Sequence, residues 1–238
     1  MLCVNEIEQR QNCQNCKLKQ DGFFCHLSPA ATKEFESIRY SSVYPAGAML
    51  FLENESARGV YLLCSGEVKL SVSSSAGKTL ILRIARPGEV LGLTATMSGA
   101  PYEASAETLH PCQVAYIRRE DFLGFVKQYP EVYQAVIRQL NSQYNHACEQ
   151  LRTVGLSCSA QAKLARLLLL WSSEGRLTKE GTQITVPLTH EQIAECVGST
   201  RETITRTLSE FKNKHLIMPR GATVIIPNRG ALEAICST

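Results

Sequence analysis

Apolar residues in the first half of the chain recur with the short period of β-strands. Val68, Leu70 and Val72 alternate with polar residues, which predicts a strand with one buried face. Apolar runs of strand length occur on both sides of this segment, at residues 61–63, 80–84 and 114–117. Glycines separate these runs at the spacing of turns in a compact antiparallel structure. The pattern therefore predicts an all-β region over residues 40–120.

Helices are predicted on either side of that region. Ser28 followed by Pro29 combines an N-cap residue with a proline at the first helical position, so a short helix begins there. After Pro130 the pattern is helical and contains no glycine before Gly155. Apolar residues of this longer segment are spaced by four and three positions: Leu140, Tyr144, Ala147, Leu151 and Val154. That spacing is typical of a coiled-coil seam in a dimer, but a helix that packs on the β region would show it equally.

The last third of the chain predicts two short helices joined by a tight turn, after another helix over residues 160–171. Residues 189–192 read Thr-His-Glu-Gln and fit a capping box that begins the first short helix, which ends at Gly198. Residues 199–202 read Ser-Thr-Arg-Glu and fit a second capping box. This arrangement predicts a helix-turn-helix motif, and the turn and strand over residues 219–226 predict the hairpin of a winged helix.

The second short helix has an apolar face and a polar face. At about 100° per residue, Ile204, Leu208 and Phe211 share one side. The opposite side, with Arg201 at its edge, carries polar residues: Glu202, Thr205, Arg206 and Ser209. Arginine can bind guanine through two hydrogen bonds, and glutamate can accept one from cytosine. Three further basic residues would suit phosphates: Lys212, Lys214 and Arg220. The helix is therefore predicted to bind DNA, with a solvated helix held by salt bridges as the alternative.

Charge agrees with DNA binding once it is divided along the chain. The formal net charge of the 238 residues is +3 at pH 7, and the whole surplus lies in residues 158–238. A positive C-terminal part suits a polyanionic partner. Composition otherwise describes an ordinary globular chain with 44% apolar and 20% charged residues, long enough for one large or two modest domains.

The sequence predicts a cytoplasmic protein that does not enter a membrane. Its apolar runs are far shorter than the roughly 18 residues of a membrane span. Its first residues lack the basic and apolar segments of a secretion signal. In such a chain, ten cysteines favour free thiols or metal ligands over a disulfide framework.

An enzyme is disfavoured by the reactive residues of the chain. The five histidines are scattered, with no His-x-His pair that could begin the metal site of a β-roll oxygenase. The sequence has no glycine-rich phosphate loop, and no serine or cysteine has a partner base at motif spacing. A binding protein is therefore favoured over a catalyst.

Four segments give the chain a specific family resemblance. They are Tyr44–Gly47, Ser65–Lys69, Pro87–Gly92 and, most specific, Gly198–Arg206. From Val43 to its end the chain resembles the Crp/Fnr superfamily of bacterial transcription regulators. The resemblance implies an α+β fold with an N-terminal cyclic-nucleotide-binding-type β-roll, a long dimerisation helix and a C-terminal winged helix-turn-helix. The implied parts are a cysteine-rich segment (residues 1–27), the roll (28–128), the helix (129–157) and the DNA-binding domain (158–238).

The resemblance also gives each part an expected role. It implies a homodimer held by the helix that carries Leu140 and Val154. The dimer would bind a palindromic operator in double-stranded DNA and contact RNA polymerase. Arg201, Glu202 and Arg206 occupy the base-reading positions of the family. Thr205 would tune recognition of a flanking base.

Cyclic AMP is not expected to be the signal. In family members that bind it, a Gly-Glu pair and a later Arg-Ser or Arg-Thr pair hold the phosphate. Gly88 and Glu89 match the first pair, whereas residues 100–105 read Ala-Pro-Tyr-Glu-Ala-Ser and contain no arginine. A buried phosphate without a cationic partner is poorly compensated for its lost hydration. The sequence therefore predicts no tight cyclic AMP binding.

The cysteines offer another kind of sensor. In the Fnr branch, three N-terminal cysteines and one late in the roll hold a [4Fe-4S] cluster, and four residues match them: Cys13, Cys16, Cys25 and Cys112. The implied regulator senses oxygen or redox state through the cluster, which controls dimerisation and operator binding. Eight residues separate Cys16 from Cys25, a wider spacing than in that branch, and Cys3 could replace one ligand. A four-thiolate zinc site, a thiol switch, another small-molecule effector and inert buried thiols are the alternatives.

Overall fold

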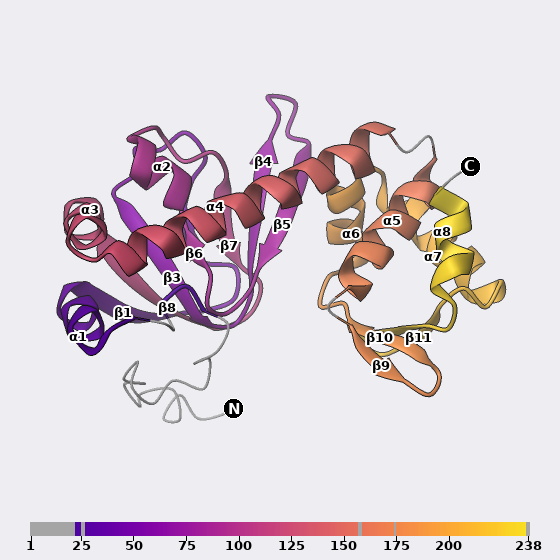
Figure 1. Ribbon diagram of the computed structural model, residues 1–238. Coiled ribbons are helices and arrows are strands. Elements are labelled where there is room, and N and C mark those ends of the chain that lie inside the picture. Colours follow the sequence, from indigo (N-terminus) through magenta and orange to yellow (C-terminus); the bar gives the residue numbers. More distant parts are fainter. Residues whose placement is uncertain (1–21, 25–26, 157–158, 174, 237–238) are drawn as a thin grey trace, which may run out of the picture. The chain divides into compact units, whose positions relative to one another are not determined.

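The computed structural model describes residues 22–24, 27–156, 159–173 and 175–236. The chain divides into two compact units (Figure 1). The N-terminal unit comprises Met1–Val72 and Arg83–Asn145, and the C-terminal unit comprises Ser73–Leu82 and His146–Thr238. Over the described ranges, no helix combines the length and the apolar composition that crossing a bilayer requires.

Two sheets form a β-roll in the first half of the chain. Their strands are β1 (Arg39–Tyr44), β2 (Met49–Phe51), β3 (Gly59–Ser65), β4 (Val68–Ser73), β5 (Thr79–Ala85), β6 (Val90–Leu91), β7 (Ser105–Thr108) and β8 (Cys112–Arg118). One sheet has the order β1-β8-β3-β6 and the other has the order β2-β7-β4-β5. In the first sheet β8 is antiparallel to both neighbours, with Val114 opposite Ser42 on one side and Leu63 on the other. The strands predicted from alternation and from short apolar runs are confirmed.

The prediction of an all-β region over residues 40–120 is wrong at α2 (Leu93–Ser98), which lies between β6 and β7. This helix is six residues long and lies between Gly92 and Gly99, both in the left-handed conformation. A helix this short repeats too few positions for its period to be recognised in the sequence. A second helix that was not predicted, α3 (Arg119–Gln128), follows β8 and buries three apolar side chains with helical spacing.

The short helix predicted ahead of the roll is confirmed as α1 (Pro29–Ile38). Ser28 Oγ accepts a hydrogen bond of 3.2 Å from the Ala31 backbone N–H, which is the bond of an N-cap residue. Figure 1 shows α1 and α3 side by side. Phe35 of α1 is fully buried in a core that also contains residues of β3, β8, α3 and α4. The helices therefore cover one face of the first sheet.

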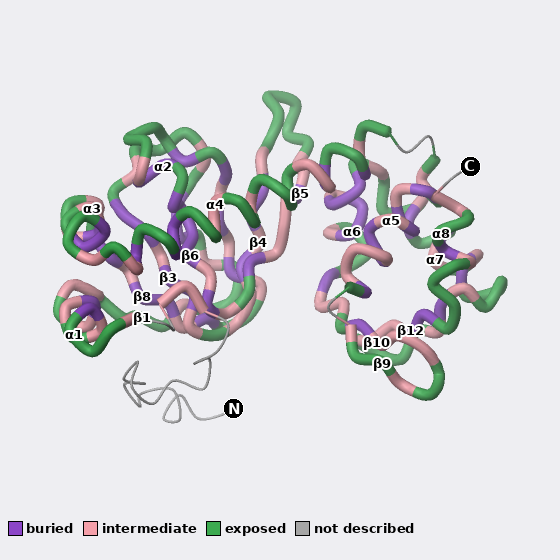
Figure 2. Tube along the Cα trace, in the orientation of Figure 1, coloured by how far each residue is buried: buried purple, intermediate pink, exposed green. Residues whose placement is uncertain are grey.

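A long helix, α4 (Pro130–Leu151), follows α3 and continues into a π-helical turn over Arg152–Leu156. The side of α4 that carries Val132 and Val136 is buried in the core of the N-terminal unit. Large apolar side chains elsewhere on α4 are exposed: Tyr133, Ile137, Tyr144 and Leu151. Figure 2 shows exposed positions along much of this helix. One face of α4 thus packs on the roll, and another apolar face is left uncovered.

The C-terminal unit is a winged helix-turn-helix, as predicted. Its elements are α5 (Ala160–Ser172), β9 (Arg176–Thr178), β10 (Gly181–Thr185), α6 (His190–Val197), α7 (Arg201–Asn213), β11 (Met218–Arg220), β12 (Thr223–Ile226) and α8 (Arg229–Cys236). The strands form one sheet in the order β11-β12-β10-β9 (Figure 1). The helices bury a shared set of apolar side chains: Leu164, Leu168, Ile193, Ile204, Phe211 and Leu232. Helix α8 was not predicted from the sequence.

Candidate functional site

The turn between α6 and α7 has the geometry of a helix-turn-helix. The capping box at the start of α6 is confirmed, because the Thr189 side chain accepts from the Gln192 N–H and the Gln192 side chain accepts from the Thr189 N–H. Gly198 ends α6 at φ 62° and ψ 47°, and its N–H donates to the Ala194 carbonyl oxygen. A residue with a Cβ is strained in this left-handed conformation, so glycine permits the tight turn.

The second predicted capping box is wrong in its register. The N-cap of α7 is Thr200, whose hydroxyl accepts from the Thr203 N–H at 3.3 Å. Ser199 still belongs to the turn, because its N–H donates to the Ala194 carbonyl oxygen at 3.0 Å. The left-handed Gly198 is followed by one more turn residue, so α7 begins at Arg201 instead of Thr200. The helical face expected to meet DNA keeps its composition.

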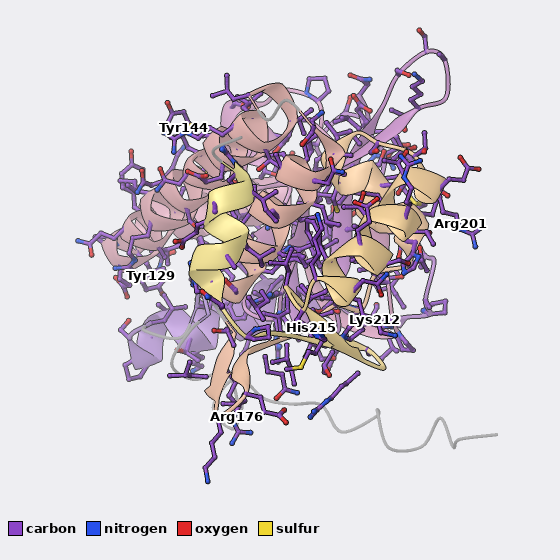
Figure 3. The ribbon with its side chains drawn as sticks, turned by 90° about the vertical axis from the view of Figure 1, so that its right-hand side faces the viewer. Tyr129, Tyr144, Arg176, Arg201, Lys212 and His215 are labelled. Atoms are coloured by element: carbon purple, nitrogen blue, oxygen red, sulfur yellow. The ribbon has the colours of Figure 1, made fainter. Side chains whose placement is uncertain are left out.

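The polar face of α7 is exposed and its apolar face is buried. Ile204 and Phe211 are buried in the C-terminal unit. The predicted base-reading side chains are exposed on the other side of the helix: Arg201, Glu202, Thr205, Arg206 and Ser209. Figure 3 shows Arg201 extending outward from the α7 ribbon, with Lys212 further along the helix. The structure therefore brings these residues together on one solvent-facing surface, and their contacts with bases stay a prediction.

A histidine outside the predicted site lies against this surface. His190 Nδ1 is 2.9 Å from Thr205 Oγ1, although the two residues belong to different helices. The hydroxyl groups on α7 also bond to the preceding turn, with Thr205 Oγ1 donating to the Arg201 carbonyl oxygen and Ser209 Oγ donating to the Thr205 carbonyl oxygen, each at 2.9 Å. No sequence pattern pairs His190 with Thr205, because their contact depends on how α6 crosses α7.

The residues predicted to bind phosphate differ in their surroundings. Lys212 and Lys214 are exposed at the C-terminal end of α7. Arg220, in contrast, forms two contacts with Glu180, at 2.9 and 3.0 Å from its two terminal nitrogens. Both side chains are about half exposed, and an exposed ion pair stabilises a protein by only about 0 to 1 kcal/mol. A phosphate could therefore replace Glu180, whose role the sequence did not indicate.

The residues predicted to form a dimer seam are distributed over two environments. Tyr144, Ala147 and Leu151 are exposed on α4, while Leu140 packs against the core of the N-terminal unit. Val154 is half-buried and belongs to the π-helical turn instead of α4.

Two seam candidates were missed at the start of α4. Tyr133 and Ile137 are each 52% exposed, and they precede Leu140 and Tyr144 by seven residues. Their spacing continues the heptad pattern toward the N-terminus of the helix and could have identified them.

Cys112 is the one predicted cluster ligand within the described residues. Its side chain is buried at the start of β8, and its single S–H proton is shared between the carbonyl oxygens of His110 at 3.1 Å and Glu67 at 3.4 Å from Sγ. Carbonyl oxygens only accept, so both contacts require the thiol proton. Burial raises the pKa of the Cys112 thiol above its ordinary value. The thiol is therefore held in its protonated form.

The other predicted ligands, Cys13, Cys16 and Cys25, lie outside the described residues. Among the residues that the structure does describe, no three His, Cys, Asp or Glu side chains are grouped so that they could hold a metal ion. Part of the chain between Cys16 and Cys25 contacts the roll. The Phe23 N–H donates to the Gly88 carbonyl oxygen at 2.9 Å, and the ring centroids of Phe24 and Phe35 are 4.2 Å apart.

Glu89, which matches the cyclic AMP site, is engaged by other groups of the roll. The Glu89 carboxylate accepts from the Arg83 guanidinium through one oxygen and from the Arg86 N–H at 2.8 Å through the other. Where a second phosphate-binding element was expected, Tyr102 stacks on Phe51 with ring centroids 4.1 Å apart. The Tyr102 hydroxyl donates to the Gly59 carbonyl oxygen at 2.8 Å. Arg83 was not identified from the sequence, because it lies outside both expected elements.

Two family models match the chain. The family described as cyclic nucleotide-binding domain matches residues 42–129. The family described as Crp-like helix-turn-helix domain matches residues 162–235. These ranges correspond to the β-roll and to the winged helix-turn-helix.

Similar curated proteins are transcription regulators. The transcriptional activatory protein AadR of Rhodopseudomonas palustris is 28% identical over 218 residues, covering 90% of this chain and 90% of that protein. The CRP-like cAMP-activated global transcriptional regulator of Mycobacterium tuberculosis is 25% identical, covering 88% of this chain and 93% of that protein. A global nitrogen regulator of Synechococcus elongatus is 28% identical, covering 80% and 86%.

Solved structures share the fold. FixK2 from Bradyrhizobium japonicum aligns with a TM-score of 0.73 at 22% identity, over 83% of this chain and 97% of that chain. A CooA variant from Carboxydothermus hydrogenoformans aligns with a TM-score of 0.75 at 19% identity, over 89% and 91%. At these identities the likeness concerns the fold alone.

Proposed function

Because the chain belongs to the Crp/Fnr family of transcription regulators, we propose that it is a homodimer that reads a palindromic operator and senses oxygen or redox state through a [4Fe-4S] cluster. Members of this family bind DNA and are typically dimers. The chain is accordingly a DNA-binding regulator and not an enzyme. The operator contacts, the dimer face and the cluster are the proposed parts.

The exposed polar face of α7 carries the DNA-reading part of the proposal. Arg201, Glu202 and Arg206 are exposed on the side of α7 opposite its buried residues. A recognition helix enters the major groove with such a face, where arginine binds guanine and glutamate accepts from cytosine. Lys212 and Lys214 would contact phosphates. The regulator would act on cytoplasmic DNA and contact RNA polymerase from its operator.

The uncovered apolar face of α4 supports the dimer. Its side chains Tyr133, Ile137, Tyr144 and Leu151 are all at least half exposed. Successive members are four, seven and seven residues apart, which keeps them on one side of the helix. A second copy of α4 packed against this face would remove the exposed apolar surface from water.

The chemistry of the donor set supports the cluster. Cys13, Cys16, Cys25 and Cys112 would supply four thiolates, the ligands that such clusters use. When bound, the cluster supplies a redox-active centre that oxygen can attack. Cys112 would have to release its proton and its hydrogen bonds to His110 and Glu67. Phe23, between Cys16 and Cys25, belongs to the same unit as Cys112, and its N–H donates to the Gly88 carbonyl oxygen of that unit.

Selection from a random duplex library tests DNA reading. The selected duplex should be a palindrome whose half-sites are about one helical turn apart. By fluorescence anisotropy at fixed salt concentration, it should bind at least about 1,000-fold more tightly than a scrambled duplex. Equal affinities for the two duplexes would contradict base reading.

Metal analysis after anaerobic purification tests the cluster. The wild type should contain roughly four irons and four sulfides per chain, and Cys112→Ser should lose them. Cys64→Ser is the matched control, because Cys64 is a half-buried thiol in the neighbouring strand β3. The Cys64→Ser protein should keep its iron. Zinc without sulfide would instead support the four-thiolate zinc site. Iron retained in full by Cys112→Ser would exclude Cys112 as a ligand.

A further inference from the structure

Thr205 lies in the middle of the polar face of α7, and its hydroxyl is engaged within the protein. Thr205 Oγ1 donates to the Arg201 carbonyl oxygen at 2.9 Å, and it lies 2.9 Å from His190 Nδ1. His190 is the first residue of α6, where the reciprocal bonds between Thr189 and Gln192 fix the helix start. The contact therefore ties the exposed face of α7 to a rigid part of α6.

The two hydrogen bonds determine which group donates to which. A carbonyl oxygen can only accept, so the single hydroxyl proton of Thr205 is directed at Arg201. His190 Nδ1 must then carry a proton and donate it to Thr205 Oγ1. Thr205 has no second hydroxyl proton to offer to an acceptor on a base. Because Thr205 is exposed, its methyl group can contact a base without breaking either hydrogen bond.

We propose that His190 is a specificity-determining positioning residue, which holds the Thr205 hydroxyl against α7 so that the Thr205 methyl group reads the duplex. Threonine in a helix divides between two χ1 rotamers, and the bond to the preceding turn stabilises one of them. The hydrogen bond from His190 is a second restraint on that rotamer. This role rests on the DNA-reading function proposed for α7.

The chemistry of the methyl group indicates which base is selected. A threonine methyl packs against the C5-methyl of thymine in the major groove, whereas a free hydroxyl can bond to several base edges. Thr205 lies one helical turn from Arg201 and directly precedes Arg206. The restrained side chain therefore selects thymine at a position beside the base pairs that Glu202 and Arg206 read.

Deoxyuridine scanning tests the role of the methyl group. Each thymine of the duplex selected by the wild type is replaced in turn by deoxyuridine, which removes only the C5-methyl. At one position in each half-site, the replacement of thymine by deoxyuridine should weaken wild-type binding by about fourfold. This factor corresponds to the burial of one methyl group. Thr205→Ser, which keeps the hydroxyl and lacks the methyl, should bind both duplexes equally. Thr205→Val keeps a methyl and holds one χ1 rotamer in a helix without any hydrogen bond, so it should retain the fourfold difference.

Variants of His190 test its positioning role. His190→Ala should reduce the deoxyuridine effect below about twofold and, in a repeated selection, admit other bases at that position, because Thr205 can then leave its rotamer. His190→Asn places an amide N–H near the position of Nδ1 and should restore the thymine preference. His215→Asn is the matched control, because His215 is an exposed histidine of the same unit with a φ of 54° that asparagine tolerates. It should behave as the wild type.

Three results would overturn the inference, and they differ in what else they overturn. A wild-type protein that selects no sequence would contradict base reading and the role of His190 together. A wild type that selects a palindrome, with an unchanged thymine preference in His190→Ala, would contradict the role of His190 alone. A fourfold deoxyuridine effect that persists in Thr205→Ser would show that another residue contacts the thymine methyl. Circular dichroism and binding to a scrambled duplex, both unchanged, show that the variants are folded.

Discussion

Helix α7, the proposed recognition helix, and the β-roll differ in how their polar side chains are engaged. On α7, Arg201, Glu202 and Arg206 are exposed to solvent. In the roll, Glu89 is held by Arg83 and by the Arg86 N–H, and the buried Cys112 thiol is bonded to two carbonyl oxygens. The surface proposed to read DNA is thus formed in advance, whereas the candidate sensing groups are already satisfied by the protein.

Solvation explains the difference. In the DNA-free protein, an exposed guanidinium is hydrated by water, which DNA can replace. It therefore needs no hydrogen-bond partner from the protein. A buried polar group without a partner is destabilising by about 1 to 3 kcal/mol, so the roll supplies partners for its own groups. A signal that acts at Cys112 or Glu89 must therefore compete with existing contacts, and a duplex that meets α7 competes mainly with water.

The largest effect is expected from adding a side chain at Gly66, which lies against Cys112. A Cβ on Gly66 would lie 2.5 Å from Cys112 Sγ and 2.8 Å from the Pro111 carbonyl oxygen, at a φ of +87°. Gly66→Ala should lower the free energy of unfolding by about 2 to 4 kcal/mol, measured in urea, through steric overlap and backbone strain. Gly77→Ala is the control, because Gly77 has a φ of +75° with nothing within 4 Å and should lose only about 1 kcal/mol. Equal losses would show that Cys112 is not tightly covered.

The next prediction concerns Arg206 on the exposed polar face of α7. Arg206→Ala should weaken binding to the selected operator by about 1 to 3 kcal/mol per half-site while sparing a scrambled duplex, because it removes a base contact. Anisotropy titrations with both duplexes measure the difference. Lys212→Ala should instead weaken both duplexes to a similar degree and flatten the salt dependence, as expected for a phosphate contact. Equal losses on both duplexes in Arg206→Ala would show that Arg206 contacts only the DNA backbone.

Another exposed surface, the uncovered apolar face of α4, is proposed to meet a second copy of the chain. Tyr144 is 68% exposed, so Tyr144→Ala should leave the monomer intact and weaken dimerisation by about 1 to 3 kcal/mol, through the loss of aromatic burial. Sedimentation equilibrium measures the dissociation constant. Arg138→Ala is the control, because Arg138 is exposed on another side of α4 and its loss should leave the dimer unchanged. An unaltered dimer in Tyr144→Ala would place the interface elsewhere.

The smallest effect is expected at a thiol that is buried in the C-terminal unit. Burial raises the pKa of Cys196 to about 12. Between pH 9 and that value an unfolded chain loses the thiol proton first, so rising pH favours unfolding. This group should lower the free energy of unfolding by about 1 kcal/mol at pH 10 and by almost nothing at pH 7. Urea unfolding at pH 8 and pH 10 should show a smaller alkaline loss for Cys196→Ala than for the wild type, and identical losses would contradict the linkage.

Local patterns in the sequence were sufficient for much of the fold. Four strands of the roll follow from alternation or from short apolar runs: β3, β4, β5 and β8. Helix α1 follows from Ser28 and Pro29, and α6 follows from its capping box. Each of these signals lies within a few residues of the structure that it predicts. The same reasoning missed α2, which is too short to show a period, and displaced the start of α7 by one residue, because the turn at Gly198 continues through Ser199.

For α4 the sequence left two interpretations open, a dimer seam and a helix that packs on the roll, and the structure shows one apolar face packed in the core and another exposed. Val132 and Val136 pack in the core of the N-terminal unit, while Tyr144 and Leu151 are exposed. A helix can pack on its own chain along one side and meet a partner along another, which a list of apolar positions does not separate.

The sequence by itself determined many elements of this protein, though not α2, α3 or α8, and the division of α7 into a polar and an apolar face. Only the tertiary structure decided which polar groups are already paired: Glu89 with Arg83, Arg220 with Glu180, Thr205 with His190, and Cys112 with two carbonyl oxygens. Periodicity and capping act between residues within one or two helical turns, so they can be recognised in a sequence. Most of these pairs join separate elements, and their contacts exist only once packing has set the distances between those elements.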